Sequence, residues 1–226
     1  MSAWLDYRLS DFLMFSPRVY GRLLELYNAA VWPLHVFAVL LGLALLVLAV
    51  REAGNAARMM AAILAAAWMW VAVAFLHQRY ASINWAAEYV AIAFIAEALW
   101  LLRVAWRAPS VPTCWKGGVV VKRIGLAMML LAVVYPLTAM AKGRPWLQAE
   151  FFGLMPDPTL IATLGALLVW RGTFRLWGAI VPVLCCVASG ATSWTLDEPL
   201  AWLAPVMAMI ASVALIVDRL TLTPRR

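Results

Sequence analysis

Long apolar runs constrain this chain more than any motif does. The runs from Ala29 to Val50 and from Leu200 to Val217 contain no Asp, Glu, Lys or Arg. A helix of about 20 such residues spans the roughly 30 Å hydrocarbon layer of a membrane and satisfies its own backbone hydrogen bonds there. The sequence therefore predicts an all-α, polytopic transmembrane helical bundle with lipid as its solvent.

Composition supports this class and excludes others. Hydrophobic residues make up 66% of the 226 residues and charged residues 13%, whereas soluble domains carry about 25% charged residues. The net charge is +7, but the basic residues are scattered over the loops, which excludes nucleic acid and favours membrane lipids as the partner. Three cysteines are too few for a disulfide framework.

Hydropathy predicts about seven spans. The fifth has the shortest apolar core, which runs only from Leu160 to Trp170. Either its helix extends back through Phe151 despite two prolines, or this segment is re-entrant and the chain has six full spans. The predicted spans are 29–50, 57–77, 82–103, 121–141, 155–170, 176–195 and 199–217.

Residues 1–28, before the first span, are predicted to be an N-terminal interfacial segment. Ser16 followed by Pro17 is typical of a helix N-terminus. Helical spacing places Arg18 and Arg22 on one face and apolar side chains on another, as in helices that lie along a membrane surface. The alternative is that this helix continues directly into the first span.

Orientation follows from the distribution of positive charge. With an outer N-terminus, about twelve Lys and Arg residues face the cytoplasm and about six face outward. The acidic loop at Asp197 and Glu198 then also faces outward. The sequence thus predicts an N-out, C-in protein made of the interfacial segment, a transmembrane helical bundle at 29–217 and a short basic cytoplasmic tail at 218–226.

Polar residues of the spans gather at the predicted outer ends. Asn84 and Glu88 are four residues apart and share a helix face, and a tight turn brings His77 near that face. A carboxylate that hydrogen-bonds an imidazole fixes its tautomer, which is the usual preparation for a metal ligand or a proton relay. The predicted ligand-binding residues are Asn28, Trp32, His35, His77, Asn84, Glu88 and Asp157.

Four of these residues also form a candidate metal site. The imidazoles of His35 and His77 and the carboxylates of Glu88 and Asp157 are ligands that zinc, manganese or iron accept. A divalent metal ion is therefore the candidate cofactor, provided that Asp157 converges on the other three. The alternative is that each histidine is a hydrogen-bonding group at its helix end and that Glu88 faces the lipid headgroups.

Other residues within the spans also call for an interpretation. Glu97 follows Glu88 by nine residues and is half a turn out of phase with it. We expect Glu97 to face protein and either to find a partner or to stay protonated, and neutralisation by a loop Arg or Lys is favoured over transport of a proton. Cys185 and Cys186 are expected to pack as small apolar side chains, and the alternative is a path for soft metal ions. Trp68 is assigned, with other aromatic residues near span ends, to an interfacial belt.

Three motifs of this chain resemble those of one family. They are Tyr27-Asn28-x-x-x-Trp32-Pro33, His77-x-x-Tyr80-x-x-Ile83-Asn84-x-Ala86, and Gly153-Leu154-x-Pro156-x-Pro158-Thr159 followed by Thr163-Leu164-Gly165. The family that they resemble consists of uncharacterised bacterial multi-pass membrane proteins, a domain of unknown function sometimes labelled permease. The resemblance implies a multi-pass protein of the bacterial inner (cytoplasmic) membrane. The family usually has cysteine between the two prolines, where this chain has Asp157. If that cysteine is a metal ligand, its role is either absent here or taken by a harder oxygen ligand, which favours a different ion.

These observations predict a small-solute or ion permease with a polar site in the periplasmic half of the bundle. The alternative is an accessory or assembly subunit of a larger respiratory or metal-handling membrane complex, which suits the short loops. Protein partners or a homo-oligomer are compatible with both. No catalytic residue is predicted, because phosphate, dinucleotide and hydrolase motifs are absent. An intramembrane redox or metal enzyme would depend on His35 and His77, the only histidines.

Overall fold

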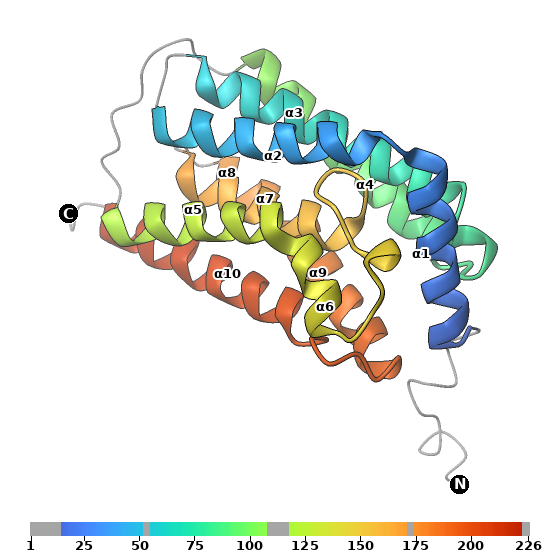
Figure 1. Ribbon diagram of the computed structural model, residues 1–226. Coiled ribbons are helices and arrows are strands. Elements are labelled where there is room, and N and C mark those ends of the chain that lie inside the picture. Colours follow the sequence, from blue (N-terminus) through green and yellow to red (C-terminus); the bar gives the residue numbers. More distant parts are fainter. Residues whose placement is uncertain (1–14, 52–54, 108–117, 171–173, 223–226) are drawn as a thin grey trace, which may run out of the picture.

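A computed structural model describes residues 15–51, 55–107, 118–170 and 174–222 of the chain. Every regular element in these ranges is helical, as the sequence predicts (Figure 1). Several predictions fall outside the described residues. They concern residues 1–14 of the interfacial segment, Cys114 and residues 223–226 of the basic tail.

The described chain folds into ten α-helices and four other helical elements. The α-helices are α1 Pro17–Val31, α2 Leu34–Arg51, α3 Ala56–Trp70, α4 Ala87–Arg107, α5 Val119–Val134, α6 Thr138–Ala141, α7 Pro156–Val169, α8 Phe174–Gly178, α9 Ile180–Thr195 and α10 Leu203–Leu222. A π-helix, η2 Val71–His77, extends α3, and the 3-10 helices are η3 Tyr80–Ser82, η4 Tyr135–Leu137 and η5 Trp146–Gln148.

Six helical stretches of the described chain are long and apolar enough to cross a membrane. Their outward surfaces stay apolar, since Phe37, Ile92 and Leu184 are each more than half exposed. Such side chains face lipid, because a helix that is apolar on all sides has no water-facing stripe. The chain is therefore a membrane protein. The stretches are Leu34–Arg51, Ala56–Ser82, Ala87–Arg107, Val119–Ala141, Arg175–Thr195 and Leu203–Thr221.

The first predicted span begins too early. α1 ends at Val31 and α2 begins only at Leu34, so residues 29–50 do not form one helix. Pro33 has no N–H to donate to the preceding turn, and its ring favours the extended conformation that Trp32 adopts. The alternative of a helix that continues straight into the span is therefore wrong, and Figure 1 shows α1 running across the end of the bundle.

The N-terminus of α1 has the predicted cap. The Ser16 hydroxyl accepts a hydrogen bond from the Val19 N–H at 3.4 Å, and Pro17 is the first helical residue. The helix is attached to the segment around η5, because Gln148 Nε2 donates to Glu25 Oε1 at 3.0 Å. Gly21 makes room for this contact, since a Cβ there would lie 2.9 Å from Gln148 Nε2.

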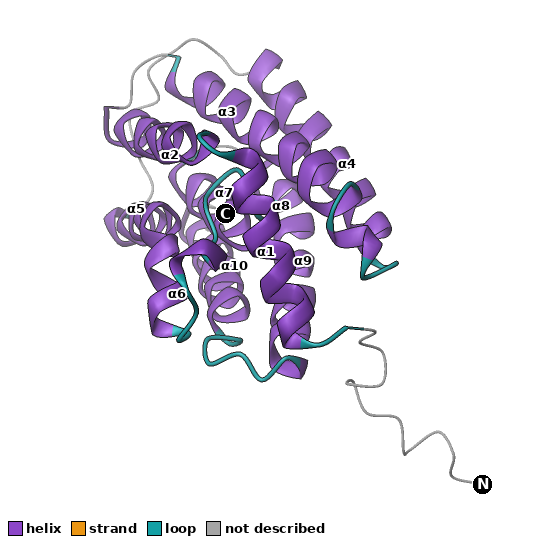
Figure 2. Cartoon of the chain, turned by 45° about the vertical axis from the view of Figure 1, so that its right-hand side comes forward, coloured by secondary structure: helices purple, strands orange, loops and turns teal. Residues whose placement is uncertain are grey.

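Helix α7 lies among the other helices of the bundle (Figure 2). All of its residues from 158 to 168 are buried, and it packs against α3, α5, α9 and α10. α5 and α7 are in backbone contact, because a Cβ on either Gly125 or Gly165 would lie 2.6 Å from the carbonyl oxygen of the other glycine. Lipid tails are as apolar as large side chains, so membrane helices associate mainly through close packing, which small residues such as glycine allow.

The segment 142–155 covers one end of the bundle and leads into α7, the shorter helix that replaces the predicted span 155–170. Gly153 has a φ of +74°, which glycine adopts without strain. Its N–H donates to Thr159 Oγ1 at 2.9 Å, and Thr159 Oγ1 donates to the Met155 carbonyl at 2.7 Å. These bonds fix the start of α7 inside the bundle, from where it runs toward the opposite end (Figure 1).

Candidate functional site

The predicted site residues fall into three separate groups, of which the first is the pair His77 and Glu88. His77 Nδ1 lies 2.8 and 3.0 Å from the two carboxylate oxygens of Glu88. The sequence predicts the proximity of these two residues, but Asn84, which is expected on the same helix face as Glu88, precedes α4 and lines a cavity instead. Their side chains are 60% and 49% exposed, however, so the pair lies on the surface of the bundle.

The second group is Asn28 with His35. Asn28 Nδ2 donates to the carbonyls of Leu147 and Ala149 at 2.7 and 3.0 Å, so Asn28 Oδ1 is the acceptor that faces His35 Nε2 at 2.9 Å. His35 Nε2 therefore carries the proton. Trp32 is 69% exposed and lines, with His35, an apolar groove of about 780 Å³ on the outside of the bundle. This pair attaches the α1–α2 corner to the segment 142–155.

The third group lines a cavity of about 180 Å³, here called the α4–α9 cavity. Asn84 and Asp157, both predicted site residues, lie on its wall. Asn84 Nδ2 donates to the Tyr80 hydroxyl at 3.1 Å, and its Oδ1 accepts from the Ala86 N–H at 3.1 Å. The polar lining comprises Tyr20, Tyr80, Asn84, Lys142, Arg144, Glu150, Asp157, Cys185, Ser189, Thr192 and Ser193.

The candidate metal set is not gathered in one place. His35 lies at the apolar groove, His77 and Glu88 lie on the surface, and Asp157 lies in the α4–α9 cavity. Within the part of the chain that the structure describes, no group of three or more His, Cys, Asp or Glu residues could hold a metal ion. Shared depth along different helices does not bring side chains together when they leave different faces of those helices.

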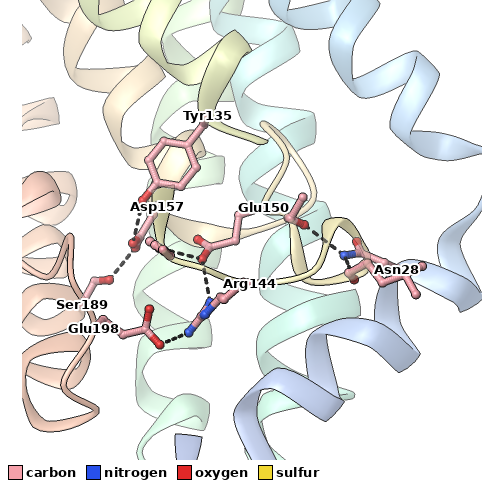
Figure 3. Close-up of polar contacts among 10 residues, drawn as sticks. Asn28, Tyr135, Arg144, Glu150, Asp157, Ser189 and Glu198 are labelled. Atoms are coloured by element: carbon pink, nitrogen blue, oxygen red, sulfur yellow. Dashed lines mark hydrogen bonds and ion pairs between the residues drawn. The ribbon is translucent and has the colours of Figure 1, made fainter. Parts of the chain in front are cut away.

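Ion pairs form one wall of the α4–α9 cavity (Figure 3). Lys142 Nζ lies 3.1 Å and Arg144 Nη1 3.5 Å from Glu150 Oε1, and Arg144 Nη2 bonds to Glu198. All four side chains are at least nine-tenths buried. Buried charges are stable only when they are paired in this way, so the network holds the segment 142–155 against the α9–α10 loop.

Asp157 lies beside this network at the first turn of α7. Ser189 Oγ donates to Asp157 Oδ1 at 2.5 Å, and the Tyr135 hydroxyl donates to Oδ2 at 3.3 Å (Figure 3). No described Lys or Arg forms an ion pair with it. Burial and the Glu150 carboxylate raise the pKa of Asp157, against the lowering effects of Lys142 and the two hydroxyl donors. The protonated carboxyl is thus favoured beyond its usual pH range.

The carboxylates of Glu150 and Asp157 also affect the pKa of Lys142. Burial alone lowers the pKa of its ammonium, but the negative charges of Glu150 and Asp157 outweigh burial, and the pKa is raised. The cluster contains two cations, Lys142 and Arg144, and three carboxylates, those of Glu150, Asp157 and Glu198. It therefore carries one surplus negative charge whenever Asp157 is ionised. A proton or another small cation is the species that such a site attracts.

Sequence reasoning missed most of this site. Lys142 and Arg144 counted only as loop charges in the orientation, and Glu198 only as part of an acidic loop. A usable signal is Glu150, because it lies directly between Ala149 and Phe151-Phe152. A carboxylate inside an apolar stretch indicates burial with a cationic partner.

The model of a family of unknown function, DUF6064, matches residues 18–225. The chain belongs to DUF6064. This membership confirms the resemblance to an uncharacterised family that the motifs indicate. No curated protein and no solved structure matches the chain. DUF6064 membership carries no activity with it, so a function is argued from the cavity.

Proposed function

We propose that this chain is a permease of the bacterial inner membrane that takes a small cation, the proton included, into the α4–α9 cavity. The observation that carries the proposal is Asp157, a carboxyl in a largely buried ionic cluster without a cation of its own. Its pKa is raised by burial and by Glu150. A group of this kind binds a proton or a cation when one is available from the adjoining aqueous phase and releases it when the surroundings change.

The size of the cavity favours an ion over a larger solute. Pockets for drug-sized ligands have volumes of about 300–1,000 Å³, and this cavity measures about 180 Å³. The neighbouring groups also suit an ion. The Tyr135 and Ser189 hydroxyls donate to Asp157, and after rotation of their O–H bonds their oxygens can coordinate a bound cation. Interrupted helices at the polar site, here the start of α7, are common in membrane transporters.

The topology proposed for this function is N-out and C-in with seven crossings. Six of them are the long apolar helices, and the seventh is α7, whose first turn, with Asp157, lies at the outer end below the segment 142–155. The positive-inside rule supports this orientation, because the opposite end of the bundle carries more of the basic residues. The α4–α9 cavity then lies toward the periplasm, where it exchanges ions with the outside.

Proteoliposomes that contain the purified chain and a trapped pH-sensitive dye test the proposal. An imposed inside-negative potential should drive faster proton entry than in empty vesicles. Asp157→Asn should reduce this entry several-fold, whereas Asp197→Asn, the same change at an exposed loop carboxyl of the same end, should not. Parallel melting curves in sodium, potassium and lithium salts detect binding of an alkali cation through a raised melting temperature.

The alternative function, an accessory subunit, makes different predictions in the same preparation. Such a subunit would leave native membranes in a stoichiometric complex with other proteins, and the isolated chain would neither conduct protons nor respond to alkali cations. Absence of both responses in folded wild-type protein would refute the permease proposal. Equal proton entry in wild type and Asp157→Asn would refute the role of the α4–α9 cavity.

A further inference from the structure

One face of α4 connects the α4–α9 cavity to a deeper carboxyl. Ala87, Val90 and Phe94 line the cavity, and their spacing of three and four residues identifies the helix face that they share. Glu97 follows Phe94 by three residues. It therefore lies one turn further along this same face, about 4.5 Å deeper along the helix axis at 1.5 Å per residue.

The facing helix α9 reaches the same depth. Ser189, which donates to Asp157, and Cys185, one turn away, both line the cavity. The Cys185 thiol is also close enough to the Glu97 carboxyl for the two groups to interact electrostatically. Cys185 thus adjoins both the cavity and Glu97, which lies one turn deeper along α4.

Glu97 is buried without the loop cation that the sequence predicts for it. It is 3% exposed, and its Oε1 has no hydrogen-bond partner within the described chain. The elements packed against α4 are α3, η2, η3, α8 and α9. The titratable or charged groups in their described residues are Arg58, His77, Tyr80, Arg175, Cys185 and Cys186.

These neighbouring groups leave the Glu97 carboxyl without an opposite charge. His77 is paired with Glu88, and Arg175 Nη2 is paired with Asp218 at 2.6 Å. No ion pair to Glu97 occurs in the described chain. An ionised carboxylate at such a position is costly, and the protonated form is the cheaper one.

We infer that Glu97 is a second proton-accepting site of this protein, which exchanges its proton with the α4–α9 cavity along the interface of α4 and α9 beside Cys185. This inference rests on the proposed function, since it extends the route of the cation from Asp157 toward the opposite side of the membrane. The proton then binds first to Asp157, beside hydroxyl donors and ion pairs, and next to Glu97, in apolar surroundings. Protonation of Glu97 removes the charge that would otherwise oppose burial.

Infrared spectroscopy of the reconstituted protein tests the inference without any transport assay. A protonated carboxyl has a C=O stretching band that is lost on ionisation and shifts when its proton is replaced by deuterium. We expect such a band at neutral pH that is absent from Glu97→Gln, retained at a shifted position in Glu97→Asp and still present in Asp157→Asn. Melting curves monitored by tryptophan fluorescence show that each variant is folded.

The route is tested by the rate of deuterium exchange. The Glu97 band should shift in deuterated buffer, and Cys185→Phe should slow this shift several-fold, because the larger ring would lie between Glu97 and the cavity that Cys185 lines. Leu184→Phe is the matched control, since Leu184 is 64% exposed on the outside of the same helix. The inference is overturned if Glu97 gives no protonated band at neutral pH, if the band does not exchange, or if the two phenylalanine variants exchange alike.

Failure here is distinguishable from failure of the proposed function. An exchangeable Glu97 band in a chain that conducts no protons would support the second proton-accepting site and refute the permease. Proton entry that depends on Asp157, together with a Glu97 that has no exchangeable proton, would retain the permease and remove Glu97 from the route.

Discussion

The contact between α5 and α7 predicts a defined loss of stability for Gly165→Ala. A Cβ at residue 165 would lie 2.6 Å from the Gly125 carbonyl oxygen, 2.9 Å from Met129 Cγ and 3.1 Å from Met128 Cβ. Met129 Cγ can move by a change of rotamer, but the positions of Met128 Cβ and of the carbonyl oxygen are set by the backbone. The two helices must therefore move apart along their contact.

The net cost follows from two opposing effects. Overpacking of a well-packed core costs about 1–3 kcal/mol, and alanine recovers up to about 1 kcal/mol over glycine inside a helix. A net loss of about 1–2 kcal/mol is expected, because a clash with a backbone atom relaxes less than one with a side chain. For a chain of this length, about 2–4 °C in melting temperature corresponds to 1 kcal/mol, so Gly165→Ala should melt roughly 2–8 °C lower.

Tryptophan-fluorescence melts in detergent measure this difference. Gly118→Ala is the matched control, since a Cβ there meets only Val121 Cγ2 at 3.8 Å. The double variant Gly125→Ala with Gly165→Ala should lose less than the sum of the single losses, because one separation of the helices accommodates both methyl groups. A Gly165→Ala protein that melts at or above the wild-type temperature would refute the close approach of α5 and α7.

Further variants probe three sets of polar contacts. Trp68 Nε1 is buried and donates to Thr163 Oγ1 at 2.8 Å. Thr163→Val removes this acceptor and should lower the free energy of unfolding by about 1–3 kcal/mol. Thr163→Ser keeps a hydroxyl and should lower it by less. Arg144→Gln should cost about 3–5 kcal/mol, and adding Glu198→Gln should recover part of the loss, as melting curves would show. Asp157 has a raised pKa, so its protonated form stabilises the fold. This stabilisation is complete below the ordinary pKa of an aspartate and is lost as the pH rises through the raised value. Between acidic and neutral pH, the melting temperature of Asp157→Asn should therefore fall less than that of wild type.

Local signals in the sequence were sufficient for several features of the site. Spacing and a short turn predicted the contact between His77 and Glu88, and the half-turn offset correctly separated Glu88 from Glu97. The offset did not indicate which of the two faces of α4 lines a cavity. The structure puts the cavity on the Glu97 face, since Glu88 is exposed and Glu97 is buried.

Contacts between distant segments were beyond the reach of these signals. Arg144 and Glu198 are separated by 54 residues and meet only because α7 and α9 bring their loops to the same end of the bundle. Trp68 shows the same effect. Its aromatic character and position predicted an interfacial belt, yet it is fully buried and donates to Thr163 of α7.

The sequence by itself determined that this is a helical membrane protein, roughly where its long helices lie, and how Ser16 and Pro17 start α1. These features depend on the length of apolar runs, on helical periodicity and on capping, all of which are local. Only the tertiary structure decided which helix faces meet, that α7 is enclosed, and that Asp157 joins an ionic cavity. The physical reason is that lipid is as apolar as a protein core. Hydropathy therefore identifies the residues that avoid water, but not which of them face protein and which face lipid.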